Sequence, residues 1–269
     1  QRIAGCTWSP DGQWVVYSCS ETQYTFSIKV VNVKTGKKHL LTESRFRDVS
    51  PTFDPEGRFV YFLSYREFNP VYDSMYFDLG FPRGMRPYLI SLQADTPSPF
   101  MAGKPTAPKD KERAARSEKA KTDEQKNEAA KPKPIRIDFD GITERTAAFP
   151  FPEGRYSQIL GVRGKVLITS VPIKGSLDNG ANSVGPSADA TLEVYDFDEK
   201  KRETLATGVT DFKLSRASET LIYRSGDKLR VTTLSPAERD RASDPKPGRV
   251  SGWLNLERIK PEIVPTEEW

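Results

Sequence analysis

The sequence predicts an all-β protein, a β-propeller built from four-stranded blades. The segment SPDGQWVVY at residues 9–17 recurs as DPEGRFVYF at 54–62, and the segment at 28–42 aligns without gaps on 192–206. Each match repeats a strand, a turn and a second strand, and no helical periodicity of apolar residues accompanies them. A repeat of roughly 40 to 50 residues made of short strands is typical of propeller blades rather than helical solenoids.

The repeated turns justify the first two blades, at about residues 3–47 and 48–149. In each turn a proline presets one backbone angle and a glycine accepts a positive φ, while the acidic residue, Asp11 or Glu56, bonds to the local backbone. Each turn therefore joins two antiparallel strands, and we interpret both carboxylates as turn formers.

Two insertions enlarge the second blade. Residues 69–85 carry four aromatic side chains and are too apolar for a free linker. We expect this insertion to be an ordered loop, of the kind in which binding residues gather on rigid scaffolds; its aromatics capping the blade core is an equally good interpretation. Residues 102–134 contain no Val, Ile, Leu, Met, Phe, Tyr or Trp, so we predict a flexible charged insertion that buries nothing.

The third blade is predicted at 155–207 and the fourth at 209–264. The third contains the run KVLITS at 165–170 followed by the repeat at 192–206. The fourth carries a degraded copy of the same turn and further strand-like residues near its end. We therefore expect about four to five blades of a larger ring, and a chain that is a piece of a longer protein.

Charge and hydropathy argue against two classes of partner. The formal net charge is +4, and the flexible insertion alone holds ten basic and six acidic residues, so the rest of the chain balances. A domain that follows phosphates concentrates Lys and Arg on one face, and we predict no nucleic-acid partner. No run of 18 apolar residues occurs, and we predict no membrane span.

The sequence contains few residues suited to metal binding, cofactor binding or thiol chemistry. The cysteines are Cys6 and Cys19, outside any C-x-x-C pair, and His39 is the only histidine. We predict neither a metal nor a cofactor. A disulfide between Cys6 and Cys19 across one hairpin is conceivable, and two buried thiols are favoured.

The sequence also lacks a recognisable catalytic set. No G-x-S-x-G, no G-x-x-x-x-G-K-[ST] and no G-x-G-x-x-G motif occurs. His39 aligns with Glu203 in the repeat, so it occupies a position that accepts an exposed polar residue and is interpreted as structural. By its own residues the chain is non-catalytic, and whether it belongs to an enzyme depends on its parent protein.

Six further segments of the sequence are distinctive: PVYDSMYFD (70–78), MRPYLISL (85–92), DTPSPF (95–100), PIRIDFDGI (134–142), FPFPEGRY (149–156) and SGWLNLERI (251–259). The joined Phe-Pro-Xaa-Gly-Met-Arg-Pro-Tyr and Ser-Gly-Trp patterns are more specific than the S-P-D-G turns that many propellers share. Together these segments resemble the second propeller of bacterial tricorn-protease homologues.

Membership of this family would imply part of a large serine peptidase that degrades oligopeptides. Such enzymes combine a six-bladed propeller, a seven-bladed propeller and a C-terminal catalytic region with a PDZ-like domain. The resemblance places this chain in the later blades of the seven-bladed propeller, before the catalytic residues, so no catalytic residue is carried over. The implied role is to gate or channel peptides toward an active site outside this chain.

Arg83 and Arg86 are the candidate substrate-binding residues. A guanidinium can pair with a carboxylate terminus through two parallel hydrogen bonds. The alternative is that Arg83 and Arg86 each form an ordinary ion pair on the protein surface.

The expected partners are peptide substrates, the remaining blades and the catalytic domains of the parent chain, and a homo-oligomer is compatible with the family. The sequence does not decide the cellular compartment, with the cytoplasm favoured over the periplasm.

Two other functions are alternatives to the peptidase segment. A stand-alone propeller would be a protein-interaction scaffold, and the propeller of a prolyl-oligopeptidase-type enzyme would be followed by a G-x-S-x-G domain.

Overall fold

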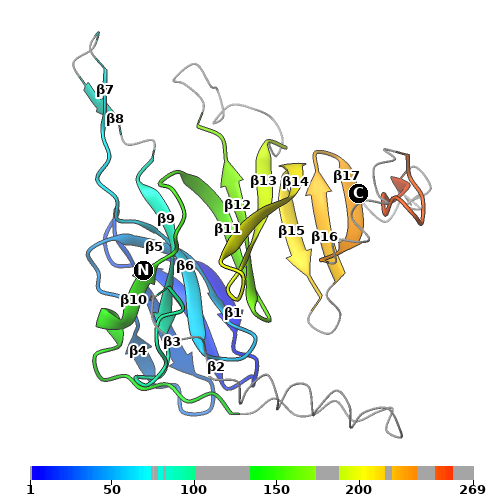
Figure 1. Ribbon diagram of the computed structural model, residues 1–269. Helices are drawn as coiled ribbons and strands as arrows, with labels where there is room; N and C mark the ends of the chain where they lie inside the picture. The colour runs from blue at the N-terminus through cyan, green and yellow to red at the C-terminus, as the bar shows by residue number, and fades with distance from the viewer. Residues whose placement is uncertain are drawn as a thin grey trace, which may run out of the picture. The chain divides into compact units, whose positions relative to one another are not determined.

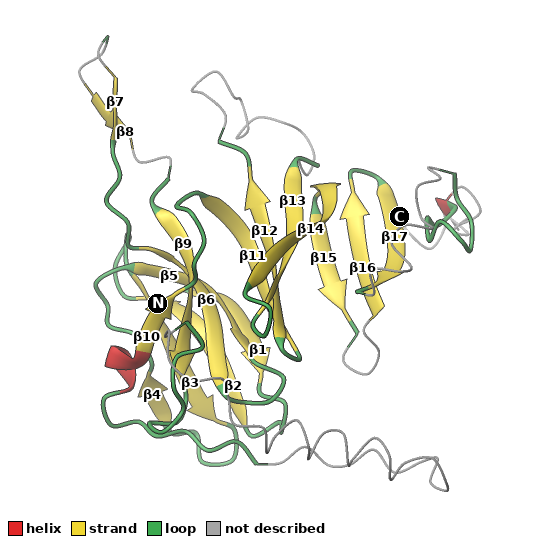
Figure 2. Ribbon diagram, in the orientation of Figure 1, coloured by secondary structure: helices red, strands yellow, loops and turns green. Residues whose placement is uncertain are grey.

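The computed structural model describes residues 2–73, 75, 78–80, 83–100, 134–173, 188–215, 220–234 and 246–256. Strands dominate these residues, and the 3-10 helix η1 (Ile142–Arg145) is one turn long (Figures 1 and 2). Residues 102–133 of the charged insertion and residues 235–245 and 257–264 of the fourth predicted blade lie outside the described ranges.

The chain forms two compact units. The first comprises Gln1–Glu67, Met85–Pro152 and Ile159–Arg163, and the second comprises Phe68–Gly84, Glu153–Gln158 and Gly164–Trp269. Each is described by itself.

The first unit begins with a four-stranded antiparallel meander. Its strands are β1 (Ile3–Trp8), β2 (Trp14–Ser20), β3 (Phe26–Asn32) and β4 (Lys38–Leu40). The turn between β1 and β2 forms as the sequence predicts. Asp11 Oδ1 accepts the Gln13 amide at 3.0 Å, Ser9 Oγ accepts the Trp14 amide at 2.9 Å, and Gly12 has a φ of 68°.

A second meander follows in the same unit. Its strands are β5 (Arg47–Phe53), β6 (Phe59–Tyr65), β9 (Met85–Ser91) and β10 (Thr146–Ala148). A parallel pairing of Phe26 with Arg47 joins it to β3, so the eight strands make one continuous sheet.

The core of the first unit draws on both meanders. Successive side chains of a strand point to opposite faces, and Phe59–Ser64 of β6 are all buried, so both faces of that strand are covered. A fully buried Ile, Leu or Phe contributes about 1.5–3 kcal/mol. The buried cluster consists of Val16, Ile28, Val30, Leu41, Phe53, Val60, Phe62, Tyr88, Ile90, Leu92 and Ile142.

The second unit holds three further sheets. The four-stranded sheet runs β11 (Arg155–Val162, of which residues 159–162 are grouped with the first unit), β12 (Lys165–Val171), β13 (Ala190–Asp196) and β14 (Lys201–Val209). The three-stranded sheet runs β15 (Asp211–Leu214), β16 (Thr220–Ser225) and β17 (Lys228–Thr233). Their first strands are linked, because Gln158 Nε2 donates to Asp211 Oδ1 at 2.6 Å. The third sheet is the hairpin of β7 (Val71–Asp73) and β8 (Asp78–Gly80).

A short segment lies beside β17 at the position of an outer strand. Trp253 bridges to Arg230, and the Val231 amide donates to the Gly252 carbonyl at 2.9 Å. This pairing brings part of the strand-like sequence near residue 250 onto the three-stranded sheet.

The single histidine lies in an aromatic stack. The His39 ring is 3.6 Å from the Phe139 ring, centre to centre, with an angle of 9° between the planes, and Trp14 meets it edge-on. Burial lowers the pKa of His39, and the positive charge of Lys37 lowers it further. This environment favours the neutral imidazole and fits a structural role.

Cys6 and Cys19 do not form a disulfide with each other. Cys19 is buried and Cys6 is exposed, so the expectation of two buried thiols is wrong for Cys6. The reason is the position of β1, an edge strand of the sheet on which most residues keep contact with solvent.

Candidate functional site

Arg86 is engaged in contacts within the first unit. Its Nη1 lies 3.2 Å from Glu67 Oε1, and its Nη2 donates to the Phe149 carbonyl at 3.1 Å. The third guanidinium nitrogen, Nε, is buried and has no hydrogen-bond partner among the described residues. The structure therefore gives Arg86 a local carboxylate partner.

Glu67 is held from a second side by Tyr88. The Tyr88 hydroxyl donates to Glu67 Oε1 at 2.6 Å, and burial together with this hydrogen bond raises the pKa of Tyr88. Tyr88 therefore stays protonated across the physiological range and keeps donating to the carboxylate.

Arg66 lies against the same tyrosine and is neutralised by a different carboxylate. Its guanidinium carbon is 5.0 Å from the Tyr88 ring centre and 4.8 Å from that of Phe46. Its Nη2 pairs with Asp48 Oδ2 at 2.9 Å, and the Asp48 side chain is fully buried. Arg66 is thus fixed between aromatic rings with its charge compensated.

Arg83 belongs to the second unit, in the connection that follows β8, and it is exposed. No hydrogen bond or ion pair joins it to another residue that the structure describes. Arg83 and Arg86 fall in different units.

Arg47 is a candidate that sequence reasoning missed. This exposed residue begins β5, and its guanidinium carbon lies 5.5 Å from the Phe26 ring centre and 5.6 Å from that of Tyr65. In the part of the chain that the structure describes, no carboxylate pairs with it. Only the pairings of Arg47 with Phe26 and with Tyr65 bring the three residues together, and no local sequence signal predicts the first pairing.

We call Phe26, Phe46, Arg47 and Tyr65 the aromatic–arginine surface. Phe46 and Tyr65 are 36% and 45% exposed, so the surface is open to solvent. Rings on either side restrict the guanidinium without using its N–H donors, and they attract its charge. Such an arrangement suits a planar anion such as a carboxylate, which a guanidinium binds through paired hydrogen bonds.

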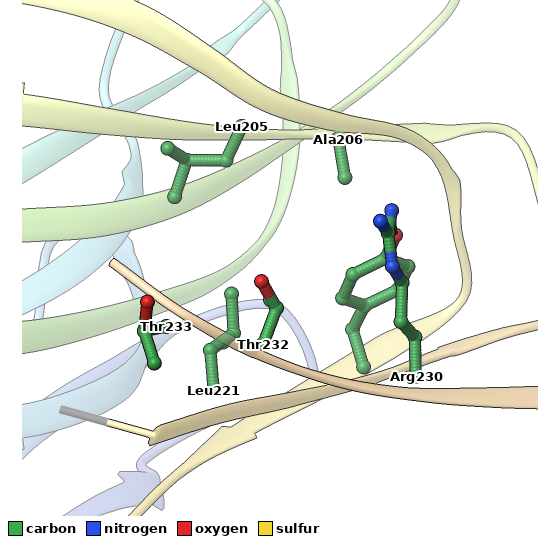
Figure 3. Close-up of a pocket in the computed structure, with 7 residues that line it drawn as sticks. Leu205, Ala206, Leu221, Arg230, Thr232 and Thr233 are labelled. Carbon is green, nitrogen blue, oxygen red and sulfur yellow. Dashed lines mark hydrogen bonds between the residues drawn. The ribbon is translucent and has the colours of Figure 1, made fainter. Parts of the chain in front are cut away.

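A separate hollow, open to solvent, lies in the second unit (Figure 3). Arg230 points into this region, but its Nε donates to the Ser251 carbonyl and its Nη1 to the Tyr223 hydroxyl, both at 2.9 Å. These contacts fasten the segment around Trp253 to β17. The hollow is lined by Leu205, Ala206, Leu221, Tyr223, Arg230, Thr232 and Thr233.

No group of three His, Cys, Asp or Glu side chains in the described ranges is arranged to hold a metal ion. None of the helices found there is long and apolar enough to cross a membrane.

Comparisons with known proteins agree with one another. The family model described as the tricorn protease second beta propeller domain matches residues 1–235. The chain is 32% identical to tricorn protease homolog 1 of Streptomyces coelicolor over 99% of its own length and 24% of that protein. It is 30% identical to the tricorn protease homolog of Saccharolobus solfataricus over 97% of its own length and 21% of that protein. It thus spans between a fifth and a quarter of the length of these relatives.

The fold of this chain also resembles that of the tricorn protease. The crystal structure of the tricorn protease matches 88% of this chain and 21% of that protein, with a TM-score of 0.66 at 22% identity. The predicted all-β class and incomplete propeller are thereby confirmed. The chain belongs to the family of the tricorn protease second β-propeller domain.

Proposed function

We propose that this chain is the part of a longer tricorn-like serine peptidase that admits oligopeptide substrates, without performing the hydrolysis itself. The observation that carries the proposal is the family match over residues 1–235, combined with a chain whose one histidine is held in an aromatic stack. A nucleophile needs a base within hydrogen-bond reach, and among the residues that the structure describes His39 makes no hydrogen bond to a hydroxyl or thiol; its ring stacks on Phe139. The hydrolytic residues belong to another part of the polypeptide.

The aromatic–arginine surface supplies the peptide contact in this proposal. A peptide carries a carboxylate at its C-terminus, and Arg47 is an exposed guanidinium fixed between two rings. Fixing the side chain before binding reduces the entropy lost on contact. An uncompensated positive charge also raises the local concentration of anionic peptides.

Arg83 and Arg86 contribute differently. Arg83, exposed near the hairpin, is a second proposed contact for peptide carboxylates. Arg86 is proposed as a positioning residue, because its Nη atoms already hold Glu67 and the Phe149 carbonyl.

The blade assignment completes the proposal. We propose blades at residues 3–47, 48–149, 155–207 and 209–264, with the segment at Trp253 as the outer strand of the last. The remaining blades and the catalytic domains are the intramolecular partners, and a homo-oligomer in the cytoplasm is the proposed setting.

The experiment that tests this function measures peptide hydrolysis by the parent protein, by the 269-residue chain and by the parent carrying Arg47→Glu. We expect the parent to hydrolyse peptides and the 269-residue chain not to. In the variant we expect the KM for anionic peptides to rise about tenfold, because roughly one charge-assisted contact is lost. A parent without hydrolytic activity would leave the scaffold function, and one with a G-x-S-x-G domain would indicate the prolyl-oligopeptidase type.

A further inference from the structure

The side chains of Phe26, Arg47 and Tyr65 form one row across the sheet of the first unit. Phe26 of β3 is paired with Arg47 of β5, and Arg47 with Tyr65 of β6. Residues directly opposite one another on neighbouring strands place their side chains on the same face of a sheet. The distances agree, since the Arg47 guanidinium carbon lies 5.5 Å from the Phe26 ring centre and 5.6 Å from that of Tyr65. We call these three residues the Arg47 row.

The two rings of the Arg47 row offer a ligand different surfaces. The Tyr65 side chain is 45% exposed, and its partner on the next strand is Met85, an apolar residue that is buried. Phe26 is half-buried, and its partner on the far side is the polar Ser20. The surface beside Arg47 is therefore apolar and accessible on the Tyr65 side.

Arg47 carries a charge that the acidic residues of the neighbouring segments do not neutralise. Each of those carboxylates pairs with another cation: Glu21 with Lys29, Glu43 with Arg45, Asp48 with Arg66 and Glu67 with Arg86. A ligand carboxylate that binds Arg47 therefore displaces no ion pair described for this residue.

A peptide bound to Arg47 by its C-terminal carboxylate brings its last side chain close to the Arg47 row, because the carboxylate and the side chain share one Cα atom. An aromatic side chain in that place can pack on the exposed ring of Tyr65, and pairs of aromatic rings attract one another beyond the area that they bury. A small side chain leaves the ring in water.

We propose that Tyr65 is a specificity-determining residue, which favours peptides that end in an aromatic residue. The inference rests on the proposed function in taking a peptide carboxylate as the ligand of Arg47. It goes further by naming the side chain that the site selects.

Equilibrium binding to the intact parent protein tests the proposal. Three peptides carry a fluorophore at the N-terminus and differ only in a C-terminal Phe, Ala or Asp. The parent is treated with a fluorophosphonate, which blocks a serine nucleophile, so that the peptides stay intact while fluorescence anisotropy gives each Kd. The Phe peptide is expected to bind about fivefold more tightly than the Ala peptide, within the range that a pair of rings supplies. Tightest binding of the Asp peptide would show that charge alone selects the ligand, and it would overturn the proposal.

Three variants locate the preference for the Phe peptide. Tyr65→Phe keeps the ring and is expected to keep the preference, whereas Tyr65→Thr is expected to reduce it below about twofold. Trp8→Thr is the matched control, because Trp8 is an exposed aromatic residue at the end of β1 next to the turn, outside the Arg47 row, and the preference should remain. The ratio of the two Kd values is the readout, since a general loss of structure weakens both peptides alike. A preference that survives Tyr65→Thr, or that Trp8→Thr also removes, overturns the proposal.

Peptide hydrolysis by the untreated parent separates this proposal from the proposed function. A parent that binds the Phe peptide preferentially through Tyr65 but hydrolyses no peptide would refute the proposed function and leave the role of Tyr65 standing. A parent that hydrolyses peptides but binds the Phe and Ala peptides equally, or binds neither, would refute the role of Tyr65 alone.

Discussion

Gly5 and Ser50 adopt the same left-handed backbone conformation at matching points of β1 and β5. Their φ angles are 82° and 55°, they lie 45 residues apart, and each falls where the pairing of its strand shifts register. A Cβ built on Gly5 would lie 4.0 Å from the Ser50 Cα. The two first strands therefore carry the same β-bulge, which is the structural counterpart of the sequence repeat.

Replacement of Gly5 by alanine is expected to destabilise the protein. A left-handed conformation costs a residue with a Cβ about 1–2 kcal/mol, and space is not the limit because the nearest atom would lie 3.9 Å away. Chemical denaturation measures the change. Gly154→Ala is the control: its Cβ would also meet only ordinary contacts and no positive φ is involved, so little change is expected. Equal losses at both sites would refute the strain argument.

The ion pair of Asp48 and Arg66 is expected to be sensitive to loss of charge. Asp48 is fully buried and Arg66 is 18% exposed. Asp48→Asn leaves the guanidinium without its counter-charge, at a cost of about 3 kcal/mol in the free energy of unfolding. The matched change, Glu43→Gln, removes a pair whose side chains are 50% and 75% exposed, and it is expected to cost under about 0.5 kcal/mol. If the two substitutions differ by less than about 1 kcal/mol in the free energy of unfolding, which is the upper value for an exposed ion pair, the result would contradict a buried ion pair between Asp48 and Arg66.

His39 gives stability a pH dependence of known sign. Its pKa in the folded protein lies below the ordinary 6.5 because of burial and Lys37. The unfolded chain therefore binds more protons in this range, so stability is complete above pH 6.5 and decreases as the pH falls through 6.5 toward the folded pKa. The thermal midpoint is expected to fall by about 1–2 °C from pH 7.5 to 5.5.

His39→Phe is the control for this dependence. The ring keeps a flat aromatic face for Phe139 and cannot be protonated, so the change in midpoint between pH 7.5 and 5.5 is expected to shrink. An unchanged slope would show that carboxylates rather than His39 set the dependence.

The charged insertion and the segment that follows it are expected to contribute very differently to the stability of the protein. Replacing residues 102–130 by a Gly-Ser linker of equal length should move the thermal midpoint by less than about 2 °C, because that sequence has no large apolar side chain to bury. Ile135→Ala should cost about 1–2 kcal/mol. Ile135 packs against Gly57, and its amide donates to Asp11 Oδ2 at 2.7 Å. A large loss from the linker exchange would mean that the insertion itself docks.

The repeated turns and strands were predictable because they depend on local residue chemistry. Proline, an acidic residue and glycine select the turn, and alternating apolar residues select the strands that it joins. The aromatic–arginine surface was not predictable in this way. Arg47 meets Phe26 through a parallel pairing between two separate meanders, and nothing in either local sequence encodes that neighbour.

The two arginines chosen from sequence illustrate the same limit. Arg83 and Arg86 are separated by two residues, yet they fall in different units. Glu67, the carboxylate beside Arg86, lies on the far side of the hairpin insertion in sequence. Contacts that span an insertion depend on the folded path of the chain, so the partner of Arg86 could be seen only in the structure.

The most direct test of the account compares Arg47→Glu with Arg45→Glu in the parent protein. Arg45 is 75% exposed and pairs with Glu43, so it is a nearby control without flanking rings. The rate of hydrolysis is measured for a peptide with a free C-terminal carboxylate and for its amide. The account predicts a kcat/KM for the free acid that falls about tenfold in the Arg47 variant only, with the amide little changed. Equal effects of the two substitutions, or an equal loss for acid and amide, would contradict a peptide-admitting role for this surface.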